Sequence, residues 1–267
     1  MIGKILFILL IFSITLSSCS FNRLFYRTGS EYVEFNDSVF AFFNLVNKQG
    51  KVISGIESNI SNPKANILLV HGNSGNISGW RNFAYPLIKE GYNVTIFDYQ
   101  GYGKSEGKPN HKNVARDAQL FLDHIYSKDK TTPLVLWGLS LGGNLATYLA
   151  YKNPGKVNYL AIEAGFTSHK DIAIYFVPDI IKPAAWMFVK SPYASKKLIS
   201  KLQIPILIIH STDDKIVPYG MGKTLYEASN KKATLWTIGG EHCYGIFNYK
   251  ESYIEKMNQL IHLKSGL

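Results

Sequence analysis

The chain has 267 residues, 46% of them hydrophobic and 18% charged, which suits one large domain with a buried core and excludes a disordered protein. Its formal net charge is +10, but the lysines are scattered and nucleic-acid-binding motifs are missing. We interpret the charge as a basic solvated surface and expect no nucleic-acid partner. The chain has two cysteines, Cys19 and Cys243, which excludes a disulfide framework as a source of stability.

The first residues carry the pattern of an export signal. Lys4 precedes an apolar run over residues 5–12, which is too short to span a bilayer comfortably. The sequence Leu-Ser-Ser-Cys, ending at Cys19, follows and resembles the bacterial lipoprotein processing box. We expect residues 1–18 to be a signal peptide, Cys19 to be lipidated and residues 19–38 to be a tether. The protein would then be a membrane-anchored lipoprotein of the cell envelope, in the inner or the outer membrane; a plain signal or an uncleaved anchor is the alternative.

Beyond the tether, short apolar runs alternate with helical stretches. Continuous apolar strands separated by helices predict an α/β protein with a mostly parallel, buried sheet flanked by helices, in one domain over residues 39–267. The first two strands are expected to form an antiparallel pair at one edge. We expect strands at residues 39–46, 51–56, 66–70, 93–97, 134–137, 157–162, 206–209 and 234–238, and helices at 80–89, 113–126, 141–151, 220–228 and 249–263.

One interval interrupts this alternation. Residues 165–201 join two expected strands, are rich in aromatic side chains and contain three prolines. A long insertion of this kind is often functional. We interpret it as a short helical lid and consider Trp186 and Phe188 candidates for the lining of a substrate pocket. The alternative is that its aromatic residues only pack the insertion onto the core.

Two segments match G-x-S-x-G, in which a nucleophilic serine sits in a strained turn between a strand and a helix and the glycines permit close packing. Ser140 follows an apolar strand directly and opens a helix, whereas Ser105 is followed by a loop. We therefore expect Ser140 to be the nucleophile. The string around Ser105 also imitates a phosphate-binding loop, but Asp98 stands where that loop needs a glycine.

A serine needs a base, and the base needs an acid that holds it in one tautomer. Asp213 and Asp214 follow one expected strand and His242 follows the last, so the order serine, acid, histidine is the one this fold requires. We assign His242 as general base. The residues by themselves leave the two adjacent carboxylates as alternatives.

The glycine-rich loop that begins at His71 can aim a backbone N–H into the same site. We expect the oxyanion hole to consist of the amides of Asn73 and Leu141, and His71 to brace the loop. The remaining histidines lack metal-ligand spacing, and Cys243 is expected to be a small buried apolar residue. No metal and no organic cofactor are expected.

Together these motifs resemble the α/β-hydrolase superfamily, in particular its monoacylglycerol-lipase-like, palmitoyl-thioesterase-like and serine-aminopeptidase-like branches. The resemblance covers about residues 39–263 and implies that Asp214, three residues before the valine of Val-Pro, is the acid. It also implies a structural role for the block from Asp98 to Ser105. Leu139 departs from the histidine that is common before the serine. The motifs are His71-Gly72-Asn73, Asp98–Ser105, Gly138–Gly143, Asp214–Pro218 and Gly240-Glu241-His242.

The sequence therefore predicts a serine hydrolase that cleaves a carboxylic ester through an acyl-enzyme, with a lipid ester as one candidate substrate. Thioester and peptide substrates are the alternatives. A non-catalytic binding protein on a hydrolase fold is a further alternative, although such proteins usually lose one member of the triad. The expected partners are a small-molecule or lipid ester and, through Cys19, a membrane.

Overall fold

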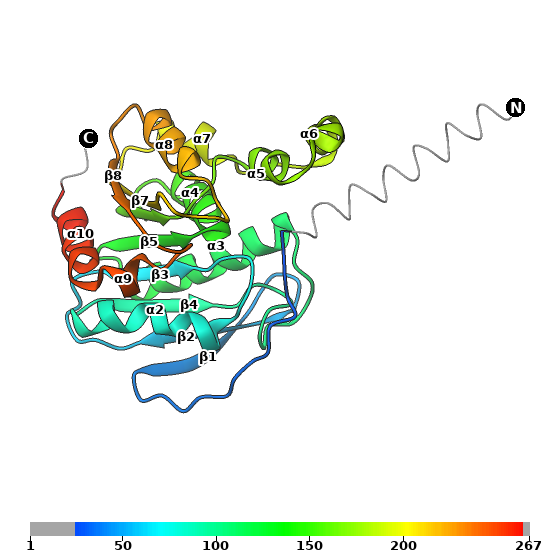
Figure 1. Ribbon diagram of the computed structural model, residues 1–267. Helices are drawn as coiled ribbons and strands as arrows, with labels where there is room; N and C mark the ends of the chain where they lie inside the picture. The colour runs from blue at the N-terminus through cyan, green and yellow to red at the C-terminus, as the bar shows by residue number, and fades with distance from the viewer. Residues whose placement is uncertain (1–24, 264–267) are drawn as a thin grey trace, which may run out of the picture.

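The structure, a computed structural model, describes residues 25–263, which form a twisted sheet with helices on both faces (Figure 1). The sheet has eight strands in the order β1-β2-β4-β3-β5-β6-β7-β8. Their bounds are β1 Phe40–Val46, β2 Val52–Ser58, β3 Asn66–Val70, β4 Asn93–Phe97, β5 Leu134–Leu139, β6 Tyr159–Glu163, β7 Ile206–Ser211 and β8 Thr234–Ile238.

The pairing of the strands confirms the predicted fold class. Strand β1 lies at one edge and pairs antiparallel with β2, which pairs antiparallel with β4. From β4 to β8 all neighbours are parallel. Every residue of β3, β5 and β7 is buried, as expected for strands covered on both faces. The carboxyl ends of these strands therefore meet at one rim of the sheet.

Two apolar cores lie on the two faces of the sheet. Side chains of one strand alternate between them, so Leu136 belongs to one core and Trp137 to the other. Helices α2 (Ile77–Lys89) and α10 (Lys250–His262) cover one face, next to the short α9 (Gly245–Asn248). Helices α3 (His111–Lys128), α4 (Leu141–Lys152) and α8 (Tyr219–Ala228) cover the other.

Helices α2 and α3 begin earlier than predicted, because an asparagine caps each of them. The side chain of Asn76 accepts a hydrogen bond from Ser78 N, so α2 starts at Ile77 instead of residue 80. The side chain of Asn110 accepts from the amides of the second and third helical residues, so α3 starts at His111 instead of residue 113. Strands β3, β4 and β8 have the predicted bounds.

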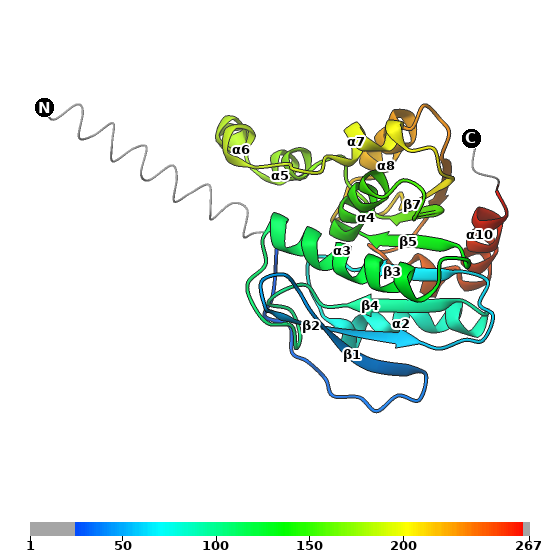
Figure 2. The ribbon, with the colours of Figure 1, turned by 180° about the vertical axis from the view of Figure 1, so that it is seen from behind.

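The interval over residues 165–201 is helical, as predicted. It contains α5 (His169–Phe176), α6 (Lys182–Phe188), α7 (Ser195–Leu198) and two short 3₁₀ turns. Helices α5 and α6 project from the body of the domain, whereas α7 packs on α4 (Figures 1 and 2). Over residues 25–263, the helices are all too short or too polar to cross a membrane.

Residues 25–38 contain no helix or strand. They still pack on the domain, since Tyr26 is buried and Arg27 N donates a hydrogen bond to Asn73 O. The expected signal peptide and the expected lipidation site, Cys19, lie outside the described residues. Those expectations stay predictions.

Candidate active site

Ser140 occupies the sharp turn between β5 and α4, with a backbone φ of 54° and ψ of −117°. Such a conformation costs a non-glycine residue about 1–3 kcal/mol and persists where the surroundings fix it. Here a Cβ at Gly142 would lie 1.8 Å from the carbonyl oxygen of Val70. The Ser140 amide also donates a 2.9 Å hydrogen bond to the carbonyl of Glu163. The strand–turn–helix context predicted for Ser140 is the one observed.

Ser105, the second match to the motif, has a structural environment. Its side chain is buried and donates a 2.7 Å hydrogen bond to the carbonyl of Asp98. It also accepts a 2.9 Å hydrogen bond from Ser54 N, which attaches the loop to β2. The Asp98 carboxylate accepts from Ile77 N at 2.8 Å, and burial raises the pKa of this carboxyl to about 7. These contacts shape the loop.

Asp214 and His242 come together at the rim of the sheet. His242 Nδ1 lies 2.7 Å from Asp214 Oδ2. The other oxygen, Oδ1, accepts hydrogen bonds of 2.8 Å from the amides of Ile216 and Val217. Burial raises the pKa of the Asp214 carboxyl, but the bond to His242 and these amides outweigh it, so the pKa is below its usual range. Asp214 therefore stays ionised and holds one nitrogen of the imidazole.

Asp213 lies on the other side of the same loop. Its carboxylate accepts a 3.0 Å hydrogen bond from Gly240 N, and its side chain is exposed. The buried His210 supports the loop from below, with Nε2 donating to the Val217 carbonyl at 2.9 Å. Of the two adjacent carboxylates, Asp214 is the one that contacts His242.

The loop of residues 71–74 is held by its carbonyl groups. Each of the four carbonyls accepts a hydrogen bond from a side chain; the donors are, in order, Tyr99 Oη, His71 Nδ1, Tyr102 Oη and Trp80 Nε1, at 2.7, 2.8, 2.8 and 2.9 Å. Burial lowers the pKa of His71 to about 4, so the ring is neutral at pH 7. His71 thus braces the loop, as the sequence suggested.

The two amides expected to form the oxyanion hole lie next to the turn that carries Ser140. None of the hydrogen bonds among residues 25–263 uses the Asn73 N–H. Leu141 is the first residue of α4, where an amide has no acceptor within its own helix. Both N–H groups are therefore available to an external oxygen.

Glu163, which the sequence analysis missed, links the two halves of the site. It ends β6 and is 1% exposed. Its carbonyl accepts from Ser140 N, while Oε1 accepts a 2.8 Å bond from Gly245 N and Oε2 a 2.8 Å bond from Tyr253 Oη. Trp137 Nε1 donates to Tyr253 Oη, so the tyrosine proton points to Glu163. The sequence signal was a lone glutamate at the end of an apolar strand, but its partners lie 82 and 90 residues away.

Cys243, next to His242, is buried, as predicted. Its backbone φ of 60° lies in the left-handed region, which is uncommon for a residue other than glycine. Burial raises the pKa of the thiol well above its usual value, and the Ser140 backbone offsets part of this effect. The thiol is therefore an unreactive packing group that places the histidine loop against the nucleophile turn.

Two cavities open beside the site. One of about 630 Å³ is lined by His242, Tyr244 and the Asp213 loop. Another of about 550 Å³ lies along the loop after β3 and has aromatic walls of Trp80, Phe83, Tyr244 and Phe247. Tyr244 lines both cavities.

The two lid residues chosen from the sequence lie elsewhere. Trp186 and Phe188 line neither of these cavities. The Trp186 side chain is 63% exposed on α6, with Lys170 Nζ 4.5 Å from its ring centre. Their role in a substrate pocket stays a prediction. Within the described part of the chain, no three His, Cys, Asp or Glu side chains are grouped so that they could hold a metal ion.

A mostly parallel sheet with a serine in a strained turn after β5, and an aspartate and a histidine after β7 and β8, defines the α/β-hydrolase class of serine hydrolases. Within this class, the family described as serine aminopeptidase, S33, matches residues 61–195, just over half of the chain. The protein belongs to this family. The matched stretch includes Ser140 and ends before Asp214.

Two relatives show how far the similarity extends. The chain is 30% identical over 202 residues to a lysophosphatidylserine lipase, ABHD12, of Danio rerio, which covers 70% of this chain and 53% of the relative. It is 27% identical over 255 residues to the uncharacterized protein YfhR of Salmonella typhi, which covers 89% and 86%. The chain thus spans about half the length of the fish lipase and most of the bacterial protein.

Solved structures share the fold. The esterase Pf2001 of Pyrococcus furiosus superposes with a TM-score of 0.72 and 18% identity, over 90% of this chain and all of that one. Est1E of Butyrivibrio proteoclasticus, solved with ferulic acid, gives 0.67 and 19%, over 83% and 100%. Identities this low establish the fold alone.

Proposed function

We propose that this hydrolase cleaves carboxylic esters, with Ser140 as nucleophile, His242 as general base and Asp214 as the acid that orients the imidazole. The observation that carries the proposal is the 2.7 Å hydrogen bond between His242 Nδ1 and Asp214 Oδ2, at the rim where Ser140 occupies its strained turn. A relative named as a lipase and fold neighbours named as esterases support ester cleavage.

The first half of the reaction forms an acyl-enzyme. Because His242 donates Nδ1–H to Asp214, its Nε2 is the nitrogen that accepts the Ser140 proton. Ser140 Oγ then bonds to the ester carbon, and the carbonyl electron pair moves onto oxygen. The amides of Asn73 and Leu141 stabilise that oxyanion; one such donor is worth about 10²- to 10³-fold in turnover. Collapse breaks the ester C–O bond, and His242 protonates the leaving alcohol.

The second half reverses these roles with water. His242 takes a proton from water, the hydroxide attacks the acyl carbon, and the same two amides stabilise the second oxyanion. Release of the carboxylic acid returns the proton to Ser140 Oγ. No step requires a metal or an organic cofactor.

We infer that Glu163 is a positioning residue for this reaction. Its carbonyl and carboxylate bind the Ser140 amide and the Gly245 amide, so one residue fixes the distance between the nucleophile turn and the histidine loop. Burial raises the pKa of the Glu163 carboxyl, and the hydrogen bonds from Gly245 N and Tyr253 Oη offset part of this effect. When ionised, the carboxylate also favours the imidazolium that forms when His242 takes the serine proton.

The substrate class is the finer part of the proposal. The aromatic walls beside the loop of Asn73 favour an acyl chain or an aromatic acyl group over a charged one. The fish relative is named for a lysophospholipid substrate, which favours a lipid ester. The description of the family favours a peptide substrate as the second candidate, and a thioester is the third.

Activity profiling of the purified protein tests these candidates together. A fluorophosphonate probe should label Ser140, because only an activated serine reacts; no labelling would favour a non-catalytic binding protein. A panel of p-nitrophenyl esters, acyl thioesters and aminoacyl amides then ranks substrates by kcat/KM. The proposal expects an ester to rank first, and a leading aminoacyl amide would replace it with a peptidase.

We also propose that the chain is anchored to a membrane of the cell envelope by a lipid on Cys19. The support is the position of Leu-Ser-Ser-Cys directly after the apolar run of residues 5–12. Replacing Cys19 with alanine should remove the lipid mass and shift the protein to the soluble or precursor pool. Unchanged mass and unchanged detergent extraction would favour a plain hydrophobic anchor.

A further inference from the structure

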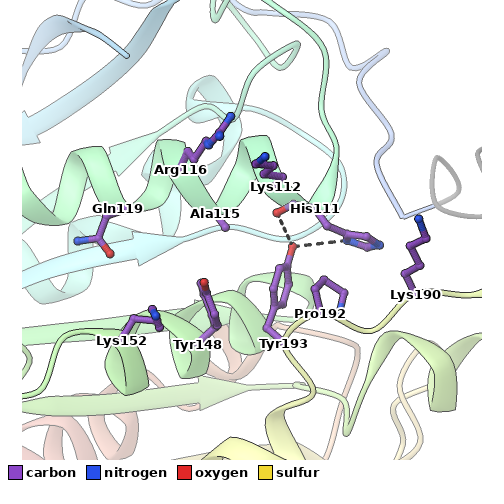
Figure 3. Close-up of a pocket in the computed structure, with 10 residues that line it drawn as sticks. All are labelled: His111, Lys112, Ala115, Arg116, Gln119, Tyr148, Lys152, Lys190, Pro192 and Tyr193. Carbon is purple, nitrogen blue, oxygen red and sulfur yellow. Dashed lines mark hydrogen bonds between the residues drawn. The ribbon is translucent and has the colours of Figure 1, made fainter. Parts of the chain in front are cut away.

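A cationic pocket lies at the base of the projecting helices. It has a volume of about 550 Å³ and is walled by α3, α4 and the segment after α6 (Figure 3). Four of its ten lining residues are cations, and none is an aspartate or a glutamate; the cations are Lys112, Arg116, Lys152 and Lys190. No ion pair among residues 25–263 involves Lys112, Arg116 or Lys152, all of which are exposed. The pocket therefore offers concentrated positive charge to an anion.

The helices that project above this pocket expose apolar side chains. Six large hydrophobic residues of α5, α6 and the turn between them are at least 39% exposed, and Ile180 reaches 89%. Single exposed hydrophobic residues are ordinary, but six within a segment of 13 residues form an apolar surface that usually has a partner. They are Tyr175, Phe176, Ile180, Ile181, Trp186 and Met187.

The cationic pocket lies next to the first residue of α5. The first described residues of the chain, Phe25 and Tyr26, pack at the same place. His111, which lines the pocket, stacks edge-on against His169, the first residue of α5, with ring centres 4.5 Å apart. Phe25 packs on His169 at 4.8 Å, and Tyr26 Oη lies 2.7 Å from His111 Nδ1. Both views show the described chain beginning beside the first turn of α3, on the side of α5 and α6 (Figures 1 and 2).

This arrangement limits where a membrane can lie. Phe25 is the sixth residue after Cys19, and each extended residue spans at most about 3.6 Å, so an anchor at Cys19 lies within about 22 Å of the base of α5. The bilayer that holds the anchor is thus on the side of the molecule where the apolar helices project.

We propose that α5, α6 and the pocket below them form a docking surface for an anionic phospholipid bilayer. The exposed apolar side chains enter the interface between headgroups and acyl chains, and Lys112, Arg116, Lys152 and Lys190 bind lipid phosphates. The surface rests on the proposed anchor for its orientation but not for its chemistry. Docking would present the rim that carries Ser140 to lipid substrates and would explain why an exported hydrolase keeps an exposed apolar face.

Tryptophan quenching by lipids with brominated acyl chains measures whether α6 enters the bilayer. Trp186 is exposed, whereas Trp137 is fully buried and Trp80 and Trp236 are partly buried. The full chain in vesicles that contain phosphatidylglycerol should lose fluorescence, and Trp186→Phe should remove that loss. The same measurement on Cys19→Ala separates the two proposals, since its quenching reports on the helices whether or not the lipid is attached.

Charge variants measure how much the cations of the pocket contribute to vesicle binding. The triple variant K112Q/R116Q/K152Q should lower binding to phosphatidylglycerol vesicles about 10- to 100-fold, with binding to phosphatidylcholine vesicles unchanged. The triple variant K223Q/K231Q/K232Q has the same net charge, and its exposed lysines lie on α8 and after it; it should bind like the wild type. Melting temperatures report whether each variant is folded.

Three results would overturn the proposal. Equal quenching of the wild type and Trp186→Phe would show that α6 stays out of the bilayer. Equal loss of binding in both triple variants would show that total charge acts rather than the pocket. Concentration-dependent dimerisation that Trp186→Phe abolishes, without vesicles, would show that a second copy of the chain covers the apolar helices.

Discussion

The rim that carries Ser140 and the helices that project beside it differ in how many contacts hold their side chains. At the rim, the Ser140 amide donates to the Glu163 carbonyl, and the carboxylates of Glu163 and Asp214 accept from the amides of Gly245 and Val217. Glu163 is 1% exposed. In α6, Trp186 and Met187 are 63% and 68% exposed. The rim is therefore fixed by many directional contacts, whereas the apolar side chains of the projecting helices are exposed.

This difference predicts how each region responds to substitution. A group fixed by several directional bonds serves chemistry that depends on geometry, so its loss lowers turnover. A group with few contacts serves binding, so its loss changes substrate or surface preference and leaves the chemical step intact. The four substitutions below test that contrast, from the largest expected effect to the smallest.

The largest effect is expected at the nucleophile. Ser140→Ala should abolish fluorophosphonate labelling and lower kcat on the order of 10⁶-fold, because the acyl-enzyme cannot form. Mass spectrometry of the labelled protein measures it. Ser105→Ala is the matched control and should keep the labelling, since Ser105 bonds to the backbone of Asp98 and Ser54. Labelling that survives Ser140→Ala would refute the assignment.

The second effect concerns the acid. Asp214→Asn should lower kcat about 10⁴-fold, because the amide no longer holds His242 in the reactive tautomer. Asp213→Asn should cost far less, since that carboxylate bonds to Gly240 N and not to the imidazole. Steady-state kinetics on one ester compares the two variants. If Asp213→Asn costs more than Asp214→Asn, the acid of the triad is Asp213.

The third effect is expected at Glu163, where Glu163→Gln should lower kcat about 10-fold. The amide keeps the size of the side chain but removes a negative charge near the imidazolium that forms when His242 takes the serine proton, so that cation is less stabilised. His210, Asp214 and Cys243 are the other titratable groups beside the imidazole, and the variant leaves them in place. Steady-state kinetics on one ester measures the effect.

A control separates charge from packing at the same place. Tyr253→Phe removes one hydrogen bond to the Glu163 carboxylate and keeps the charge. It should lower kcat less than Glu163→Gln does. If the two variants lower kcat equally, Glu163 only holds the two loops together.

The smallest effect concerns the acyl chain. Phe247→Ala opens an aromatic wall of the cavity next to the Asn73 loop and should weaken the preference for medium-chain over acetyl p-nitrophenyl esters by up to 10-fold. The sequence analysis placed that role on Trp186 and Phe188. Parallel kcat/KM series for Phe247→Ala, Trp186→Ala and Phe188→Ala decide between the two locations. If the chain-length preference changes only in the Trp186 and Phe188 variants, the acyl chain binds against the insertion of residues 165–201.

Much of this protein follows from local pattern. Apolar runs fixed the bounds of β3, β4 and β8, and the alternation of strands with helices predicted the parallel sheet. The nucleophile turn was predictable because its glycines are a local steric need: a Cβ at Gly138 would lie 2.5 Å from the carbonyl oxygen of Gly142. The helix starts were missed where one asparagine cap outweighed the apolar periodicity, as at Asn76 and Asn110.

Contacts between distant residues required the tertiary structure. The choice of Asp214 over Asp213 rested on resemblance alone until the fold brought one carboxylate to His242, 28 residues away. Glu163 meets Gly245 and Tyr253 because β6 ends beneath the histidine loop, a pairing no local pattern encodes. The lysines that looked scattered along the chain meet in one pocket because α3 and α4 lie side by side. Sequence thus determines what each segment can be, and packing decides which segments meet.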